Sequence, residues 1–129
     1  MKVVTVCGSM KFAKEMQRIA GVLAVERGLC VLQCVYDLDF ANLTSEDLNL
    51  LKSEHLKRIE ISDAIYVVNI DGYIGNSTKL EIEYATKLGK EVIYHEFNLR
   101  SELNNYRPFN EDEKDNVKKV LDFLTNNTN

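Results

Sequence analysis

Short apolar runs alternate along this chain with longer segments in which apolar residues recur at helical spacing. The apolar runs predict strands at Lys2–Cys7, Leu29–Tyr36, Ala64–Asn69 and Glu91–His95. The segments between them predict helices at Ala13–Arg27 and Ser45–Ser62, and a third helix that is capped by Ser77 or Thr78 and runs through Leu88. This alternation is typical of a parallel sheet with helices on both faces.

Apolar stripes on the predicted helices indicate which faces pack on the sheet. The expected stripe residues are Met16, Ile19, Ala20 and Leu23 in the first helix, Leu48, Leu51 and Ile59 in the second, and Ile82 and Ala85 in the third. The 129 residues contain no internal linker and are 45% hydrophobic, enough for one core. We therefore predict one doubly wound α/β domain at residues 1–125, a flavodoxin-like or Rossmann-like three-layer sandwich with a four- to five-stranded parallel sheet. Val117–Leu124 is predicted to be a closing helix, and residues 126–129 a frayed tail.

Turn-forming and polar residues follow the first and third predicted strands. Parallel strands end at the same edge of their sheet, where ligands bind in open α/β folds, and Tyr36 also lies at that edge. The first turn can let a backbone approach a ligand at Gly8, offer a hydroxyl at Ser9 and offer a cation at Lys11. The expected binding residues are Gly8, Ser9, Met10 and Lys11 after the first strand, and Asn69, Asp71, Gly75, Asn76 and Ser77 after the third.

Two glutamates lie near the start of the third helix, and only one of them can face this edge. Glu81 and Glu83 are two residues apart, so they point about 200° away from each other on a helix. Glu83 lies four residues before Lys87, a spacing typical of a solvent-exposed ion pair. Glu81 lies nearer the loop, in what we expect to be the first turn, where the helix dipole favours its ionised form. Glu81 is thus the candidate carboxylate of the site.

Composition narrows the ligand to a small molecule. The net charge of −4 and the lack of lysine or arginine runs argue against a nucleic-acid partner. Cys7, Cys30 and Cys34 lack metal-ligand spacing and are expected to be free thiols in a reducing compartment, with a reactive thiol at Cys7, next to the glycine turn, as the alternative. No signal peptide precedes Val3 and no apolar run is long enough for a bilayer, so we expect a cytoplasmic protein without membrane contact. We expect no metal and no cofactor, since no Gly-x-Gly-x-x-Gly follows the first strand.

The order and spacing of these segments resemble the nucleoside 2-deoxyribosyltransferase family, including relatives that hydrolyse 2′-deoxynucleoside 5′-monophosphates. The resemblance rests on Asp63-Ala-Ile-Tyr-Val-Val, the glycine and serine loop, Glu81-Ile-Glu-Tyr-Ala and Gly89-Lys-Glu-Val, and it spans Val3 to Tyr94. It implies that Glu81 is the nucleophile that takes the deoxyribosyl group from the base and passes it to another base or to water. Glu83 stands where the family usually has glycine, which supports Glu81 as the reacting residue.

The resemblance also has departures, and it implies a partner. His55 stands where the family commonly has an aspartate that helps the departing base, and a histidine is suited to proton transfer near neutral pH. Gly75 stands where several members have aspartate or serine, and Asp71 or Ser77 would have to replace that side chain. In the family a neighbouring subunit completes the pocket, so we expect a homodimer or larger homo-oligomer with Asn104, Asn105, Tyr106 and Arg107 reaching a partner's site.

Three other readings fit parts of the sequence. Val6-Cys7-Gly8-Ser9 resembles the opening of lysine-decarboxylase-like phosphoribohydrolases, but their Pro-Gly-Gly-x-Gly-Thr motif is absent. A non-catalytic nucleotide-binding module has the same fold, because a fold does not fix an activity. A receiver-like signalling domain would need paired acidic residues after the first strand, and Cys7 is followed by glycine instead.

Overall fold

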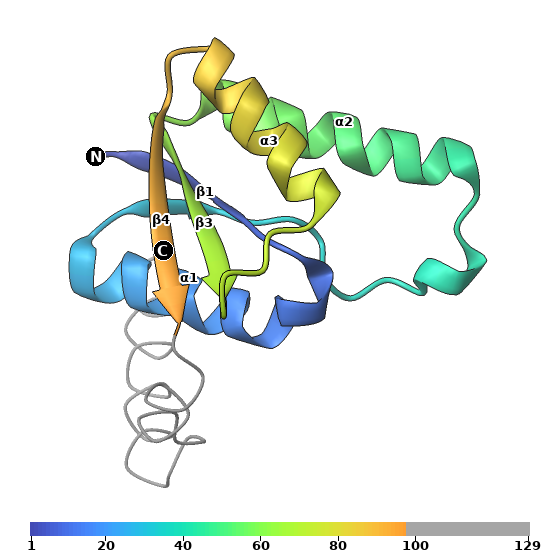
Figure 1. The fold of residues 1–129 in the computed structure, drawn as a ribbon, viewed down its shortest axis with the longest axis horizontal. Coiled ribbons are helices and arrows are strands. Elements are labelled where there is room, and N and C mark those ends of the chain that lie inside the picture. The colour runs from blue at the N-terminus through green and yellow to red at the C-terminus, as the bar shows by residue number, and fades with distance from the viewer. Residues whose placement is uncertain (98–129) are drawn as a thin grey trace, which may run out of the picture. The chain divides into compact units, whose positions relative to one another are not determined.

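One parallel sheet organises the computed structural model, which describes residues 1–97 (Figure 1). Its strands are β1 (Val3–Cys7), β2 (Cys30–Leu32), β3 (Ala64–Ile70) and β4 (Glu91–Phe97). They lie in the order β2-β1-β3-β4, and all neighbouring pairs are parallel. β3 lies inside the sheet and is buried along its whole length, as expected for a strand that is covered on both faces.

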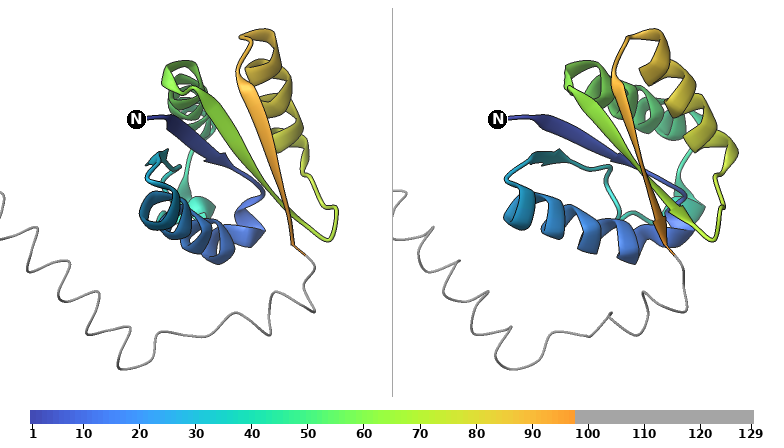
Figure 2. Two further views of the ribbon diagram at one scale, coloured as in Figure 1. Left: turned by 90° about the vertical axis from the view of Figure 1, so that its left-hand side faces the viewer. Right: turned by 60° about the vertical axis from the view of Figure 1, so that its left-hand side comes forward.

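Helices cover both faces of this sheet. They are α1 (Ala13–Arg27), α2 (Ser45–Ile61) and α3 (Asn76–Lys87), with short 3-10 turns η1 (Met10–Phe12) and η2 (Phe40–Asn42) in two of the connections. α1 lies on one face, while α2 and α3 lie together on the other (Figures 1 and 2). The structure therefore confirms a flavodoxin-like three-layer α/β fold with four parallel strands.

Most of the predicted stripe residues pack against the strands β1 and β3, which supply the larger part of the core. Met16, Ile19, Ala20 and Leu23 are buried on α1, and Ala85 and Ile82 pack with Ile59 between the sheet and the other two helices. The prediction for Leu48 was wrong. Its side chain is 46% exposed, because the first half of α2 extends beyond the edge of the sheet, and Leu51 is only partly buried.

Two element boundaries also differ from the prediction. β2 ends at Leu32 rather than Tyr36, because within residues 1–97 it pairs only with Val3, Val4 and Thr5 of β1 and has no second neighbour. α3 begins at Asn76 with Gly75 as its N-cap, so neither Ser77 nor Thr78 is the cap. Glu81 consequently lies in the second turn of α3 rather than in the first. The helix dipole acts more weakly in the second turn than in the first.

The strand order places a crevice between β1 and β3. The chain leaves β1 through α1 toward β2 on one side, and later crosses through α2 to β3 on the other side. Connections that diverge in this way leave a ligand-binding crevice at the carboxyl ends of the two central strands. The loops after β1 and β3, which carry most of the predicted binding residues, both open into it.

Some predictions fall outside the described residues. Five predictions concern residues 98–129 and stay predictions. They are the closing helix at Val117–Leu124, the loop from Asn104 to Arg107, the tail at 126–129, a fifth strand and the domain boundary at 125. Within residues 1–97, no helix combines the length and the apolar character needed to cross a bilayer.

Candidate active site

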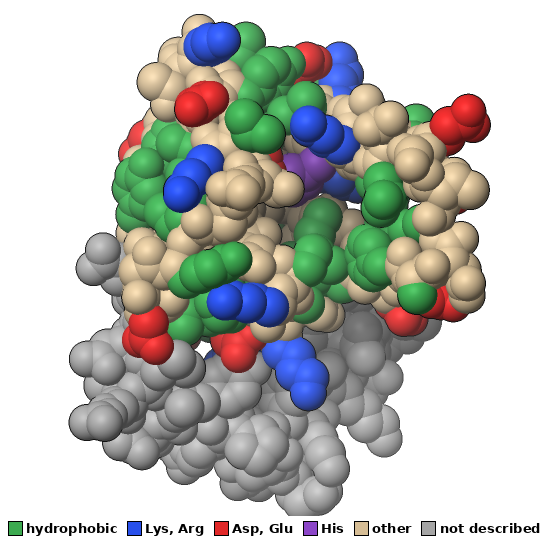
Figure 3. Space-filling model, turned by 45° about the vertical axis from the view of Figure 1, so that its right-hand side comes forward, with side chains coloured by type: hydrophobic (Ala, Val, Ile, Leu, Met, Phe, Trp, Pro, Cys, Tyr) green, Lys and Arg blue, Asp and Glu red, His purple; other side chains and the backbone are tan. Residues whose placement is uncertain are grey.

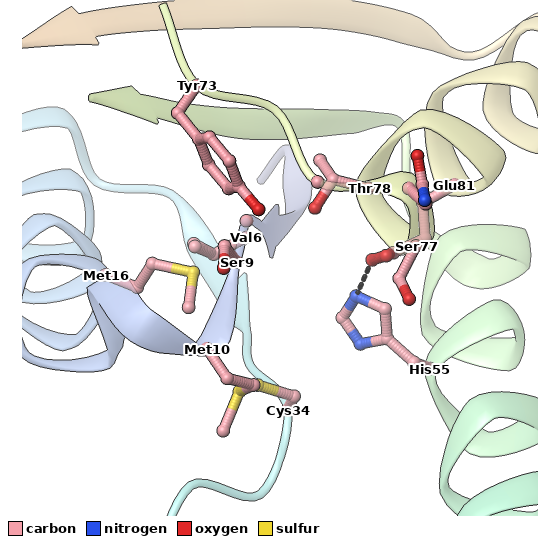
Figure 4. Close-up of a pocket in the computed structure, with 13 residues that line it drawn as sticks. Val6, Ser9, Met10, Met16, Cys34, His55, Tyr73, Ser77, Thr78 and Glu81 are labelled. Atoms are coloured by element: carbon pink, nitrogen blue, oxygen red, sulfur yellow. Dashed lines mark hydrogen bonds and ion pairs between the residues drawn. The ribbon is translucent and has the colours of Figure 1, made fainter. Parts of the chain in front are cut away.

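A pocket of about 420 Å³ lies at the carboxyl ends of β1 and β3. On the side that faces it, hydrophobic side chains surround a hollow with a histidine at its edge (Figure 3). Figure 4 shows side chains from η1, α2, the loop after β3 and the first turns of α3 converging on the pocket. The lining residues are Val6, Gly8, Ser9, Met10, Met16, Cys34, His55, Tyr73, Gly75, Asn76, Ser77, Thr78 and Glu81.

The first wall of the pocket is built around Gly8, directly after β1. A side chain here would have no room, because an added Cβ would lie 2.6 Å from Sδ of Met16 and 3.3 Å from both Cβ and the carbonyl oxygen of Val68. The glycine therefore lets β1, α1 and β3 pack closely at the edge of the site. Ser9 follows and caps η1 by accepting a hydrogen bond from the backbone N–H of Lys11.

The second wall comes from the tight turn after β3. Asp71 and Gly72 both have positive φ, 52° and 77°, and Tyr73 returns to bridge Ile70, as in a two-residue type I′ turn. The turn directs the Tyr73 hydroxyl toward the pocket (Figure 4). The Tyr73 ring meets Phe12 edge to face with centroids 5.8 Å apart, and Nζ of Lys11 lies 3.4 Å from its centroid.

The start of α3 forms the next part of the lining. Its N-cap, Gly75, has no side chain to satisfy the first backbone N–H groups of the helix. Asn76, Ser77 and Thr78 provide those groups, and all three residues line the pocket. Unsatisfied N–H groups at a helix N-terminus favour an anionic or hydroxyl-bearing ligand group.

Glu81 faces the pocket, whereas Glu83 is exposed to solvent. The side chain of Glu81 is 15% exposed and that of His55, on α2, is 13% exposed. His55 Nε2 lies 2.9 Å from Glu81 Oε1 (Figure 4). The two side chains predicted to do the chemistry therefore lie in direct contact, although they come from different helices.

Two more side chains contact this pair through His55. Cys7 Sγ lies 3.5 Å from His55 Nε2, and Arg58 Nη1 lies 3.4 Å from His55 Nδ1. Burial raises the pKa of the Cys7 thiol well above its usual value, and the negative charge of Glu81 and a hydrogen bond to that carboxylate raise it further. Cys7 is therefore a neutral thiol that donates to the carboxylate, rather than a thiolate nucleophile.

The same cluster has the donor types of a zinc site. Cys7, His55 and Glu81 offer sulfur, nitrogen and oxygen atoms that all lie within 4.8 Å of one another. The contact of Arg58 with Nδ1 opposes metal binding, because an imidazole that binds metal through Nε2 carries its proton on Nδ1 and needs an acceptor there.

Most of the predicted site residues line this pocket, but three do not. The residues that line it are Gly8, Ser9, Met10, His55, Gly75, Asn76, Ser77 and Glu81. Lys11 instead lies over the ring of Tyr73. Asn69 is buried within β3, and its Oδ1 has no hydrogen-bond partner among residues 1–97. Asp71 forms the exposed turn and shapes the site through its backbone conformation.

Sequence reasoning did not select several residues that line the pocket. They are Val6, Met16, Cys34, Tyr73 and Thr78, together with Cys7 and Arg58, which lie behind it. Tyr73 did have a local signal, since an aromatic residue between two glycines after a strand cannot join the core. Cys7 had one in its place beside the glycine turn, but its contact with His55, like that of Arg58, depends on how α2 crosses the sheet.

A second hollow of about 370 Å³ adjoins the first and shares Met10, Cys34, His55, Ser77 and Glu81 with it. Its other lining is mainly apolar and comes from η2, α2 and α3, with exposed Val35, Phe40, Leu48 and Leu80. Lys52 and Arg58 also line this hollow. The carboxylate of Glu81 thus lies where a polar pocket and a more apolar one meet.

Two solved structures have the same arrangement of strands and helices. The 2-deoxyribosyltransferase of Bacillus psychrosaccharolyticus, described as a biocatalyst for nucleoside synthesis, gives a TM-score of 0.60 at 17% identity over 81% of this chain and 92% of its own. The 2-deoxyribosyltransferase of Leishmania mexicana gives 0.56 at 17% identity over 74% of this chain and 65% of its own. The chain shares its fold with these two enzymes. This fold is the one that the sequence resemblance implied. No protein-family model and no curated protein matches the chain.

Proposed function

We propose that this chain cleaves the N-glycosidic bond of a 2′-deoxynucleoside or its 5′-monophosphate through a glutamyl-deoxyribosyl intermediate at Glu81. The observation that carries the proposal is a mostly buried carboxylate in the crevice between β1 and β3, held 2.9 Å from His55 in a pocket of the 2-deoxyribosyltransferase fold. A volume of about 420 Å³ suits a ligand of nucleoside size.

The reaction proceeds in two displacements at C1′. One carboxylate oxygen of Glu81 forms a bond to C1′ while the bond from C1′ to the base nitrogen breaks. The base leaves with the bonding electron pair and takes up a proton from solvent. In the second step a nitrogen of another base, or a water oxygen, attacks C1′, gives up its proton to solvent and releases the carboxylate. Two inversions retain the configuration at C1′, as in retaining glycosidases.

The pocket has suitable groups for the sugar and its 5′ substituent. The first backbone N–H groups of α3 and the Ser77 hydroxyl suit a phosphate or a sugar hydroxyl. Gly8 and Ser9 border the opposite wall, where the Ser9 hydroxyl can contact the ligand. Tyr73 offers an aromatic face and a hydroxyl at the rim.

Transferase and hydrolase differ only in the acceptor that reaches the intermediate. The apolar hollow beside Glu81 gives a base a place to lie while the sugar occupies the polar pocket. Such an arrangement supports exchange between bases, while the open route to solvent supports hydrolysis. A partner subunit that supplies further residues remains part of the proposal, as do a cytoplasmic location and the absence of a nucleic-acid partner.

Product analysis tests this function directly. The protein is incubated with deoxy- and ribonucleosides and their monophosphates, with and without a free acceptor base, and products are separated by chromatography. We expect Glu81→Gln to reduce base release by about a thousandfold or more, the order seen when other enzymes lose their nucleophile. Glu83→Gln is the matched control, because this exposed glutamate lies two residues further along α3.

Each other result points to a different activity. Equal turnover by the wild type and Glu81→Gln contradicts the assignment of the nucleophile. Release of base from ribonucleotides alone indicates a phosphoribohydrolase. Tight nucleotide binding without any product indicates a non-catalytic binding module.

A further inference from the structure

Arg58 lies one turn after His55 on α2 and contacts the far side of its ring. Arg58 Nη1 is 3.4 Å from His55 Nδ1. A guanidinium group can only donate hydrogen bonds, so Nδ1 must be the acceptor in this contact. The ring then carries its proton on Nε2, the nitrogen that faces Glu81.

This tautomer also satisfies the other side of the ring. Glu81 Oε1 lies 2.9 Å from Nε2, and a carboxylate can only accept. With the proton on Nδ1 instead, two lone pairs would face each other at Glu81, and two N–H groups would face each other at Arg58. One tautomer therefore fits both neighbours, and hydrogen bonds run in one direction from Arg58 through His55 to Glu81.

We propose that Arg58 is a positioning residue that fixes the tautomer of His55 and thereby the orientation of the Glu81 carboxylate. His55 holds Oε1, so that the other oxygen is left to react at C1′. This catalytic consequence rests on the proposed function, whereas the tautomer itself does not. Arg58 lines the adjoining apolar hollow rather than the polar pocket, and its contact with the Glu81–His55 pair is made through His55.

Its neighbour on α2 provides a matched control. Lys57 is a cation on the same helix, but its side chain is 70% exposed and pairs with Glu60 at 3.4 Å. Removing its charge changes the electrostatics of α2 without changing the contact to His55.

The tautomer can be read from the imidazole ¹⁵N signals of the labelled protein, in which His55 and His95 are the two histidines. We expect the Nε2–H form of His55 in the wild type, in Lys57→Met and in Arg58→Lys, which keeps a donor. Arg58→Met should give a mixture of tautomers. Arg58→Glu, which places an acceptor at Nδ1, should give the Nδ1–H form. The proposal is overturned if the wild type has the Nδ1–H form. It is also overturned if Arg58→Met and Arg58→Glu leave the His55 signals unchanged. If a variant does not fold, the wild-type spectrum alone provides the test.

Kinetics test the consequence for catalysis. We expect Arg58→Met to lower kcat by about 10- to 100-fold, since a reacting group misplaced by about 1 Å can cost that much. The change in KM should be smaller than the change in kcat, although Arg58 also lines the apolar hollow. Arg58→Lys should recover most of the loss, and Lys57→Met should behave as the wild type. Equal losses in Arg58→Lys and Arg58→Met contradict a positioning role. If the tautomers are as expected but no protein releases base, the proposed function is refuted and this inference is not. If base is released but His55 has the other tautomer, this inference is refuted and the proposed function is not.

Discussion

Sγ of Cys7 lies 3.5 Å from Nε2 of His55, although 48 residues separate them in the sequence. The contact forms because β1 ends beneath α2, at the strand edge where the crevice opens. The thiol of Cys7 is buried near the carboxylate of Glu81. Its burial and the negative charge of that carboxylate both raise the pKa of the thiol. The sulfur also lies 4.0 Å from the carbonyl oxygen of Thr5.

The raised pKa of Cys7 makes stability depend on pH. The folded protein holds this thiol neutral, whereas in the unfolded chain it ionises near its ordinary pKa of about 8.5. The stabilisation is fully present below that pH and is lost as the pH rises above it, by at most about 1.4 kcal/mol per pH unit. Urea unfolding of the wild type and Cys7→Ala at about pH 7 and about pH 9.5 measures this loss. A stability difference that does not fall between the two pH values contradicts the raised pKa.

Gly8 should tolerate no side chain. We expect Gly8→Ala to lower the free energy of unfolding by about 1–3 kcal/mol, because its Cβ would press on Met16 and Val68. Gly21→Ala is the control, since nothing lies within 4 Å of a Cβ at this exposed position in α1. It should raise stability by about 0.5–1 kcal/mol through helix propensity. Denaturant unfolding of both variants tests this prediction. A gain of stability in Gly8→Ala together with a loss in Gly21→Ala would disprove the packing account.

Tyr73 should contribute to substrate binding more than to the chemical step. It lines the pocket with Lys11 and Phe12 against its ring, and it is distant from the carboxylate in Figure 4. We expect Tyr73→Ala to raise KM by about two- to tenfold, the range of one lost aromatic contact, with kcat nearly unchanged. Tyr73→Phe removes the hydroxyl and keeps the ring, so it distinguishes the contribution of the hydroxyl to KM from that of the ring. A fall in kcat with unchanged KM would instead place Tyr73 in the chemical step.

Zinc binding should respond to the residue at position 58. Arg58 opposes an Nδ1–H on His55, whereas a glutamate there would accept it and complete a carboxylate–histidine–zinc arrangement. We expect Arg58→Glu to bind zinc at least about tenfold more tightly than the wild type, as measured by competition with a chelating dye. Adding Cys7→Ser should remove the gain. Equal zinc affinity of the wild type and Arg58→Glu would show that the donors do not act as one site.

The fold was predictable because each element carries its own signal. The bounds of α1 match the expected Ala13–Arg27, since Gly28 adopts φ of 62° and ends the helix. The end of β2 was not predictable, because the apolar residues Cys34 and Val35 continue the pattern of the strand but line the two hollows instead. Local hydrophobicity does not distinguish a residue that faces a core from one that faces a pocket.

The site was predictable only in part, for a related reason. Helical geometry separated Glu81 from Glu83, and strand edges identified Gly8 and the loop before α3. The contacts of His55 with Cys7, Glu81 and Arg58 depend on the crossing of α2 over the sheet, which no local pattern encodes. The start of α3 was misplaced because Ser77 and Thr78 are good cap residues, while the observed cap, Gly75, has no side chain.

The central claim is that Glu81 forms a covalent bond to the deoxyribosyl group. The most direct test is to quench the protein with acid during turnover of a 2′-deoxynucleoside or its monophosphate, digest it, and weigh the peptides by mass spectrometry. We expect a peptide heavier by one deoxyribosyl or deoxyribosyl phosphate group, with the modification on Glu81, present in Glu83→Gln and absent in Glu81→Gln. Base release without an adduct on Glu81, or with an adduct on another residue, would contradict it.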